Sequence, residues 1–260
     1  MRILFIGDLV GTPGRQMLKD MLPDLKKRYE IDLCLANVEN AAAGMGLTAR
    51  LAEEIQSCGV DVMTLGNHSW ARAELLQSIS RFDRLIRPAN GPASWPGQGH
   101  LVLNHPAGRI LVINLLGRVF MDPADDPFAC ADKILCGWKK DDEPGLALVD
   151  FHAEATSEKV AMGRYLNGRV ALVAGTHTHV QTADEHIMDQ GTAYITDVGM
   201  TGPANGVLGM ETESSLRRFV SQLPTRYVIA QGEAALSAIV VTADPVCGRA
   251  SHIERVRIEA

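Results

Sequence analysis

The segment RVALVAGTHTH (169–179) passes from an apolar run directly into two histidines that stand two positions apart. The run is nearly continuous in apolar residues, as expected for a strand that is covered on both faces of its sheet. If the strand geometry continues to the end of the segment, His177 and His179 point to the same side. The segment therefore predicts a buried strand that delivers two imidazoles to one site.

Similar β-rich runs recur along the chain, and helical patterns separate the early ones. The predicted strands cover residues 2–8, 32–40, 61–68, 100–104, 109–116, 146–153, 169–179, 192–200, 235–244 and 252–259. Strand–helix alternation dominates the first third, whereas the last third is richer in strands. This order predicts an α/β sandwich with a mixed sheet, or two sheets packed face to face, with helices outside. We see no internal repeat or linker, so we expect a single domain over residues 1–260.

Helices are indicated by apolar spacing of three and four residues and by capping residues. The predicted helices cover residues 14–29, 49–58, 70 to about 80, and 156–167. Thr48 is placed to cap the second of these and Ser69 the third, since hydroxyl side chains accept hydrogen bonds from the first turn of a helix. The stretch 117–145 is predicted to run over the surface.

Composition and charge restrict the class of protein. The chain has 260 residues, 46 % of them hydrophobic and 22 % charged, which is ordinary for a globular protein. A net charge of −6 without a basic block argues against long nucleic acid as a partner. Five cysteines at irregular spacings, without a CxxC motif, indicate free thiols in a reducing cytoplasm. No segment resembles a signal peptide or membrane span, so we expect a cytoplasmic protein with no membrane partner, and association with a second copy stays open.

Five predicted strands end in side chains that bind metals or carry protons. In open α/β sheets, the carboxyl ends of the strands line the ligand crevice, so these side chains would converge if the strands are neighbours. Carboxylates, amides and imidazoles without a thiolate suit Mn²⁺, Fe²⁺ or Zn²⁺. The candidates are too many for one closed tetrahedral zinc and suit two ions bridged by a carboxylate, an arrangement that hydrolyses phosphate esters. The seven candidate ligands are Asp8, Glu39, Asn40, Asn67, His152, His177 and His179.

Each candidate also has a simpler explanation. An aspartate or asparagine after a strand, such as Asp8 or Asn67, commonly forms a turn or caps a helix. His152 alone would be read as a half-buried structural histidine, and a His-x-His pair also occurs on surface strands. Five strand ends would then need five independent explanations, so a shared metal site is the favoured interpretation.

The motifs that carry these residues resemble a known family. The chain is similar to the YmdB-like branch of the calcineurin-like metallophosphoesterases, and the similarity runs in order along essentially the whole chain. It rests on GD (7–8), VENAAAGMGLT (38–48), TLGNHSW (64–70), DFHAE (150–154), AGTHTHVQTAD (174–184) and YITDVGMTGP (194–203). The wider superfamily usually has a histidine where this chain has Val10, and a bridging aspartate where it has Glu39-Asn40. The branch is similar in both departures.

The resemblance implies a fold and a ligand set. The fold is a metallophosphoesterase-type sandwich of mixed β-sheets flanked by helices. Two divalent ions are implied, with iron or manganese favoured and zinc possible, because an amide oxygen replaces one imidazole. One ion is assigned to Asp8, Glu39, Asn40 and His179, and the other to Glu39, Asn67, His152 and His177. His68 is implied to be the proton donor and not a ligand.

The implied function is hydrolysis of a small phosphodiester, a cyclic nucleotide and above all a 2′,3′-cyclic nucleotide. A metal-bridging hydroxide would attack phosphorus while His68 protonates the departing oxygen. A rival interpretation is a metal-dependent regulatory module that binds a nucleotide or an RNA end with little turnover. A metal-free nucleotide-binding protein is disfavoured, because GDLVGTPG (7–14) lacks the G-x-G-x-x-G spacing and no P-loop is present.

Three further features stay open to two interpretations each. The glycine-rich segments 41–48 and 199–209 either bring backbone amides to a phosphate or form turns with positive φ. Asp197 either orients a ligand histidine or makes a structural hydrogen bond. The aromatic residues of the stretch 117–145 either cover a nucleobase or attach that stretch to the core; they are Phe120, Phe128 and Trp138, with Pro123 between them.

Overall fold

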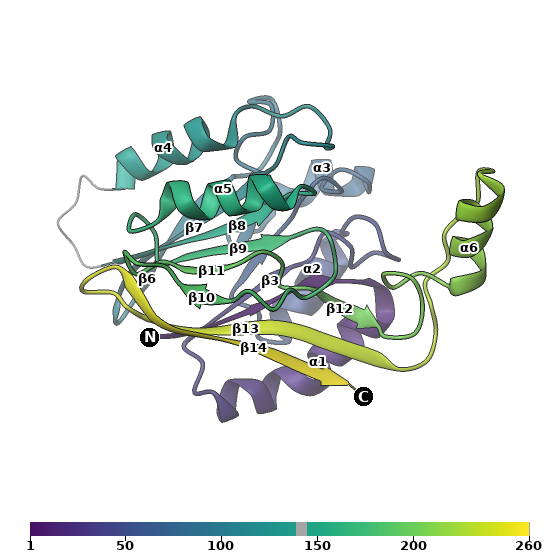
Figure 1. Cartoon of the computed structure of the whole chain (residues 1–260), viewed down its shortest axis with the longest axis horizontal. Helices are drawn as coiled ribbons and strands as arrows, with labels where there is room; N and C mark the ends of the chain where they lie inside the picture. Colours follow the sequence, from purple (N-terminus) through teal and green to yellow (C-terminus); the bar gives the residue numbers. More distant parts are fainter. Residues whose placement is uncertain (139–144, 260) are drawn as a thin grey trace.

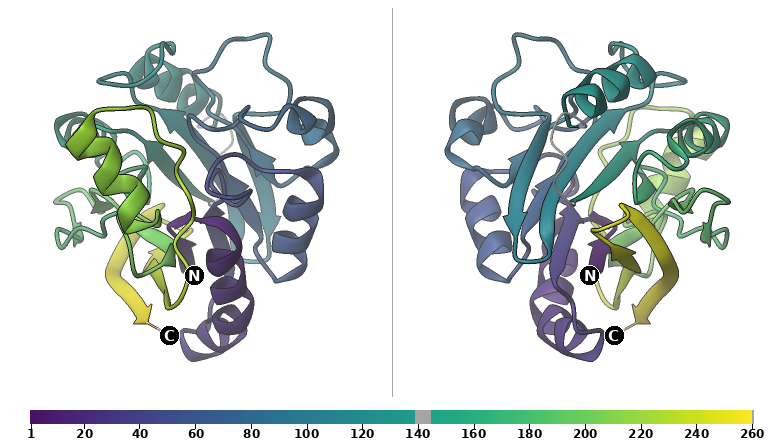
Figure 2. Two further views of the ribbon diagram at one scale, coloured as in Figure 1. Left: turned by 90° about the vertical axis from the view of Figure 1, so that its right-hand side faces the viewer. Right: turned by 90° about the vertical axis from the view of Figure 1, so that its left-hand side faces the viewer.

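Two β-sheets pack face to face at the centre of the molecule, and helices cover their outer faces (Figures 1 and 2). The structure is a computed structural model that describes residues 1–138 and 145–259. The predicted α/β sandwich of mixed sheets with outer helices is confirmed. None of the described helices is both long enough and apolar enough to cross a membrane.

The first sheet contains eight strands of the described chain. Its order is β2 (Asp8–Leu9), β12 (Met200–Pro203), β13 (Ala234–Asp244), β1 (Arg2–Ile6), β3 (Leu33–Asn37), β4 (Val62–Thr64) and β5 (Leu85–Ile86), and β14 (Arg249–Glu259) also pairs with β13. Strands β1, β3, β4 and β5 are parallel, whereas β13 is antiparallel to β1. The carboxyl ends of the parallel strands therefore meet at one edge.

The second sheet has six strands among the described residues and also keeps a parallel centre. Its order is β10 (His186–Ile187), β11 (Ala193–Ile195), β9 (Leu172–Thr176), β8 (Gly145–His152), β7 (Gly108–Leu116) and β6 (His100–His105). Strands β7, β8, β9 and β11 are parallel, and β6 and β10 are antiparallel at the two edges.

Apolar side chains on alternate strand positions fill three cores. In β1, Ile3 and Phe5 join the core between the sheets, while Leu4 and Ile6 join the core under the helices of the first sheet. The third core lies between the second sheet and its helices. Burial on both faces explains why these strands read as continuous apolar runs.

The four predicted helices are present, and the described chain has two more that were not predicted. The six α-helices of the described chain are α1 (Gly11–Arg28), α2 (Ala49–Ser57), α3 (Ala73–Ser78), α4 (Pro127–Trp138), α5 (Thr156–Leu166) and α6 (Thr212–Ser221). Thr48 caps α2 as predicted, because its hydroxyl accepts from the Leu51 amide at 3.3 Å. The predicted Ser69 cap is wrong: α3 begins only at Ala73, and the Ser69 hydroxyl donates to the Gly66 carbonyl within a turn.

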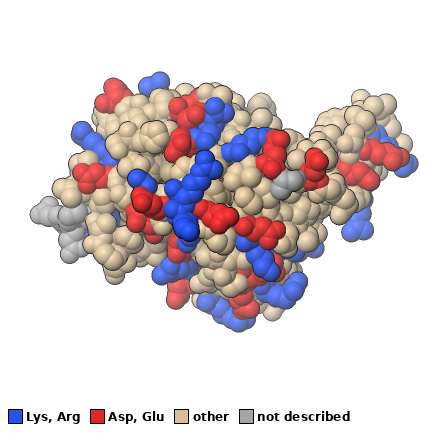
Figure 3. Space-filling view, turned by 90° about the horizontal axis from the view of Figure 1, so that it is seen from below, with Lys and Arg blue, Asp and Glu red and all other residues tan. Residues whose placement is uncertain are grey.

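The predicted surface stretch 117–145 is only partly an irregular excursion. Residues 127–138 form α4, whose Ala131 and Leu135 are buried in the third core. Positions 139–144 of that stretch lie outside the described residues. All five cysteines are free, as expected. On the face shown in Figure 3, basic and acidic side chains are interspersed.

Candidate metal centre

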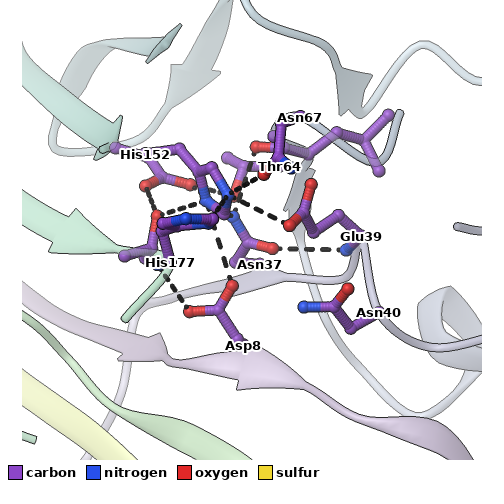
Figure 4. Close-up of polar contacts among 12 residues, drawn as sticks. Asp8, Asn37, Glu39, Asn40, Thr64, Asn67, His152 and His177 are labelled. Atoms are coloured by element: carbon purple, nitrogen blue, oxygen red, sulfur yellow. Dashed lines mark hydrogen bonds and ion pairs between the residues drawn. The ribbon is translucent and has the colours of Figure 1, made fainter. Parts of the chain in front are cut away.

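Both sheets deliver predicted ligands to one place, at the carboxyl ends of their parallel strands. From the first sheet, Asp8 follows β1, Glu39 and Asn40 follow β3, and Asn67 follows β4. From the second sheet, His152 is the last residue of β8. His177 and His179 follow β9. Figure 4 shows six of these side chains, all but that of His179, directed toward a common centre.

The Nε2 atom of His152 is surrounded by three atoms that carry lone pairs. It lies 2.9 Å from Asn67 Oδ1, 3.0 Å from Glu39 Oε1 and 3.0 Å from His177 Nδ1. A ring nitrogen carries at most one hydrogen, so it cannot donate to all three. Glu39, His152 and His177 offer possible ligand atoms that lie within 4.8 Å of one another. Such a concentration of lone pairs fits a bound cation.

The other predicted ligands lie beside this group. Asn40 Nδ2 is 3.1 Å from His179 Nε2, and Asp8 Oδ1 is 3.9 Å from His152 Nδ1. Asp8 Oδ2 accepts a hydrogen bond from the His177 amide at 3.1 Å. The structure therefore brings the seven predicted ligands together, in one group around His152 and a second around Asn40.

Two buried oxygens of this cluster, Asp8 Oδ1 and Asn40 Oδ1, make no hydrogen bond, and a third, Glu39 Oε1, lies 3.0 Å from His152 Nε2 in an ion-pair contact. Buried polar atoms are nearly always paired, because an unpaired one loses its interaction with water without replacement. Two carboxylate oxygens and an amide oxygen are suitable donors to a divalent cation. These buried oxygens are therefore the structural evidence that the residues fit a metal site.

The titration behaviour of the cluster also reflects an excess of negative charge. Burial raises the pKa of Asp8. Burial would also raise the pKa of Glu39, but the interactions with His152 and His68 together outweigh it and lower that pKa to about 2. Burial would lower the pKa of His152, yet the charges of Glu39 and Asp8 raise it to about 9. Without another cation the cluster therefore holds a proton on His152, which a metal ion would displace.

His177 and His179 reach the cluster from a turn. The expectation that strand geometry would continue to His179 and align both side chains is therefore wrong. Strand β9 ends at Thr176, and the two histidines have φ angles of 99° and 66°. Residues other than glycine rarely adopt this left-handed backbone conformation. It costs about 1–3 kcal/mol per residue and is kept only where surrounding contacts enforce it.

A buried ion pair holds this turn in place. Asp197 Oδ2 accepts from the amide of Thr178 at 3.1 Å and from its hydroxyl at 2.6 Å. The same oxygen accepts from Lys159 Nζ of α5 at 2.7 Å, and both charged side chains are buried. Asp197 thus binds the residue between the two histidines, and its carboxylate hydrogen bonds go to Lys159, Thr178 and the Gly199 amide; it therefore acts on the turn and not directly on an imidazole.

A second buried network was missed by sequence reasoning and sets the tautomer of His152. The Thr176 hydroxyl donates to Asp150 Oδ1 at 2.7 Å and lies 2.9 Å from His152 Nδ1. Because the hydroxyl has one hydrogen, Nδ1 must donate to it, which leaves the lone pair of Nε2 for the cluster. Burial raises the pKa of Asp150 to about 6. Asn37 and Thr64 also donate to Asp150.

The orientation of His177 depends on another residue that was not predicted. Its Nε2 lies 3.1 Å from Glu154 Oε2, so a proton on Nε2 would be held there and Nδ1 would face the cluster. The sequence contained a signal for these buried partners. Polar residues stand inside otherwise apolar strands, as Asp150 does in LALVDFH (146–152).

His68 stands at the edge of the cluster. Its amide donates to Glu39 Oε2 at 2.8 Å, and its half-buried side chain lines a cavity of about 380 Å³. Glu39, Asn40 and His179 line the same cavity. His68 can therefore meet a substrate in this cavity.

The other open features are only partly decided by the structure. Gly44 and Gly199 have φ angles of 85° and 88°, as turns require, but both glycine-rich segments also contribute to the wall of the cavity beside His68, through Gly44 and Leu208. Phe128 and Trp138 pack against the third core, whereas Phe120 is 89 % exposed. None of these aromatics lines the cavity beside His68, so the structure favours attachment to the core for Phe128 and Trp138.

Comparison with known proteins gives consistent matches along the whole chain. A family model described as YmdB-like protein matches residues 4–256. A Bacillus subtilis protein named 2′,3′-cyclic-nucleotide 2′-phosphodiesterase is 47 % identical over 258 residues, which is 99 % of this chain and 97 % of that protein.

Two solved structures are also similar. A hypothetical protein from Thermus thermophilus is 42 % identical with a TM-score of 0.92, covering 100 % of this chain and 99 % of that one. A protein from Mycoplasma pneumoniae described as a novel phosphatase is 36 % identical with a TM-score of 0.93, covering 100 % of this chain and 93 % of that one.

Proposed function

The chain belongs to the YmdB-like family, and from this premise we propose that it is a metal-dependent phosphodiesterase acting on cyclic nucleotides, above all 2′,3′-cyclic nucleotides. The observation that carries the proposal is the set of buried oxygens of Asp8, Glu39 and Asn40 beside His152, of which those of Asp8 and Asn40 have no hydrogen-bond partner. The name of the Bacillus subtilis relative supports the choice of substrate. We also propose that residues 1–260 form one metallophosphoesterase domain that works in the cytoplasm.

The proposed centre holds two divalent ions, with iron or manganese favoured and zinc possible. The donors are oxygen and nitrogen atoms without a thiolate, which suits these metals. Glu39 would be shared between the ions. The first ion would be held by Asp8, Glu39, Asn40 and His179, and the second by Glu39, Asn67, His152 and His177.

The residues of the chain have distinct tasks in this proposal. When bound, the two cations would lower the pKa of coordinated water and offset the charge of the phosphodiester. His68 would give its proton to the ribose oxygen that leaves phosphorus, because it lines the same cavity as Glu39 and His179. Thr176 and Glu154 would keep the ring nitrogens of His152 and His177 in the tautomers that the centre needs.

The proposal is tested by metal content and turnover. We expect two equivalents of Mn²⁺ per chain and faster hydrolysis of 2′,3′-cyclic AMP than of 3′,5′-cyclic AMP. His68→Ala should keep both metals while kcat falls by about 10²- to 10⁴-fold, the usual contribution of a general acid. His105→Ala is the control and should change neither quantity, because His105 is a half-buried histidine on β6 that does not line the cavity beside His68.

Two outcomes would contradict parts of this proposal. Undiminished turnover in His68→Ala would remove the assigned acid. Tight binding of cyclic nucleotide by the manganese-loaded protein without turnover would favour the regulatory module instead.

A further inference from the structure

The cavity beside His68 has two walls of different chemistry. The polar wall is formed by Glu39, Asn40, His68, His177 and His179. The apolar wall is formed by Met45, Val207, Leu208, Met210, Phe219 and Tyr227. The volume of about 380 Å³ lies within the range of small-molecule sites. With the proposed cations bound at the polar wall, a ligand that fills this cavity would present an anionic end to that wall and a flat or apolar body to the other.

Several side chains of the apolar wall are exposed to solvent. Phe219 is 68 % exposed, and Leu208 and Met45 are each 48 % exposed. Single exposed apolar residues are common, but several in one wall beside a polar cluster mark a binding site. The wall therefore has the character of a surface that a ligand covers.

One hydroxyl in this cavity is buried and lacks a partner. Ser215 is 1 % exposed, lines the cavity, and its Oγ makes no hydrogen bond. The neighbouring Ser214 is also buried, but its Oγ donates to the Glu211 carbonyl at 3.0 Å. A buried hydroxyl without a partner is unfavourable, so Ser215 offers a polar contact to a ligand.

Backbone hydrogen bonds tie the base of α6 to the rest of the wall. The Val207 amide donates to the Met210 carbonyl at 2.8 Å, and the Met210 amide donates back at 3.0 Å. The Glu211 amide donates to the Val228 carbonyl at 2.8 Å, next to Tyr227. Although α6 projects from the body (Figure 1), its first turn is thus attached at the cavity.

We infer that the apolar wall and Ser215 form a nucleoside subsite, which rests on the proposed function and specifies its substrate. The base lies against Phe219 and Tyr227, and the Ser215 hydroxyl meets the base or the ribose. The six apolar residues carry no charge and no amide to distinguish one base from another. Contact of this kind tolerates every base, because every base has a π-face. The subsite therefore favours phosphodiesters that carry any nucleoside over those that carry none.

The experiment compares substrates with and without a base on the manganese-loaded protein. The substrates are 2′,3′-cyclic AMP, 2′,3′-cyclic CMP and ribose 2′,3′-cyclic phosphate, followed by ³¹P NMR. We expect the wild type to show similar KM for both nucleotides and a higher KM for the ribose phosphate. Phe219→Ala should raise KM for both nucleotides by roughly 5- to 100-fold, the range of stacking on an aromatic ring, and leave the ribose phosphate unchanged.

Matched variants separate the subsite from general effects on α6. Val220 neighbours Phe219, is 83 % exposed and does not line the cavity, so Val220→Ala should change KM less than twofold. Ser215→Ala should raise KM for the nucleotides by roughly 3- to 10-fold, as expected for one hydrogen bond. Ser214→Ala is its control. Thermal unfolding of each variant verifies that the fold is kept.

The outcomes distinguish this inference from the proposed function. If the wild type hydrolyses all three substrates with equal KM, or if Phe219→Ala and Val220→Ala behave alike, the nucleoside subsite is wrong while the phosphodiesterase stands. If the wild type hydrolyses none of them, the proposed function fails, and the subsite fails with it.

Discussion

The polar wall of the cavity stands on strand ends of both sheets, whereas much of the apolar wall stands on α6 and its flanks, which project from the body (Figure 1). In the polar wall, Glu39 and Asn40 are buried; in the apolar wall, Phe219 is 68 % exposed. Side chains that hold metals must keep their positions closely, and regular strands at the core provide that. Side chains that contact a base can stand on a peripheral segment.

This contrast predicts two kinds of response to substitution. Changes beneath the polar wall should alter metal affinity and folding stability together, because the same buried hydrogen bonds serve both. Changes on α6 should alter KM alone. The following substitutions are ordered from the largest expected effect to the smallest.

His152→Ala should have the largest effect, because it removes the buried imidazole that lies beneath the polar wall. Nε2 of His152 lies within 3.0 Å of Glu39, Asn67 and His177. We expect turnover to fall by more than about 100-fold, which is the upper range for losing a residue that only supports a ligand. Mn²⁺ at 100 times its Kd should stabilise the wild type by about 2.7 kcal/mol. That gain should be absent in the variant, as thermal unfolding will show, and present in His186→Ala; a variant that kept the gain would disprove the assignment.

Lys159→Met tests whether the buried ion pair serves the metal ligands. The variant leaves the Asp197 carboxylate buried without its cation, which should cost about 3–5 kcal/mol of unfolding free energy. Since Asp197 holds Thr178 between the two histidines, Mn²⁺ affinity should fall by about 10- to 100-fold in calorimetric titration.

Met162→Ala on the same helix is the control for Lys159→Met. Met162 is buried in the third core, so its truncation should cost about 2–5 kcal/mol. It should leave Mn²⁺ affinity unchanged. If both variants lose stability and neither loses Mn²⁺ affinity, the ion pair has no role in metal binding.

Thr176→Val removes the hydroxyl that sets the tautomer of His152. We expect a loss of about 1–3 kcal/mol, because Asp150 loses a buried donor, and roughly 10-fold weaker Mn²⁺ binding. Thr192→Val deletes another buried hydroxyl, which donates to the Val170 carbonyl away from the cluster. Chemical denaturation and metal titration of the pair should show similar stability losses but a metal defect in Thr176→Val only; equal metal affinities would argue against the tautomer role.

Val220→Glu should have the smallest effect. It tests whether a change on α6 outside the cavity leaves the polar wall unaffected. The side chain is 83 % exposed on α6, so the unfolding free energy should change by less than about 0.5 kcal/mol. Metal affinity and kcat/KM should also stay within twofold of the wild type. A large loss of metal binding in this variant would show that the two walls are not independent.

Much of this arrangement was predictable from local sequence. Apolar strands ending in Asp8, Glu39 or His152 predicted both the sandwich and the convergence of polar side chains at one edge of the sheets. The resemblance to the YmdB-like branch then supplied the division into two ion sites, which stays a prediction.

Other features depend on contacts that local sequence does not contain. In the sequence, Thr176 looks like any residue that favours β-strands. The role of its hydroxyl depends on Asp150 of the adjacent strand β8, to which it donates a hydrogen bond. The turn at His177 is enforced by Asp197, which is twenty residues away in sequence. Helix α6 was not predicted, although its apolar residues Leu216, Phe219 and Val220 stand three and four positions apart; these side chains are exposed and do not join a core.

The pairing of β1 with β13 also constrains the order of events during synthesis. Strand β1 is synthesised at the start of the chain, but it pairs antiparallel with residues 238–242 near the end. It therefore lacks one neighbour until those residues have left the ribosome. Asp8 lies two residues beyond that strand, and contacts of such long sequence separation form late. We therefore expect the carboxylate of Asp8 to be held in place only after β13 has been made, because a nascent chain interrupted before β13 would carry Asp8 beside a strand that lacks one of its two neighbours.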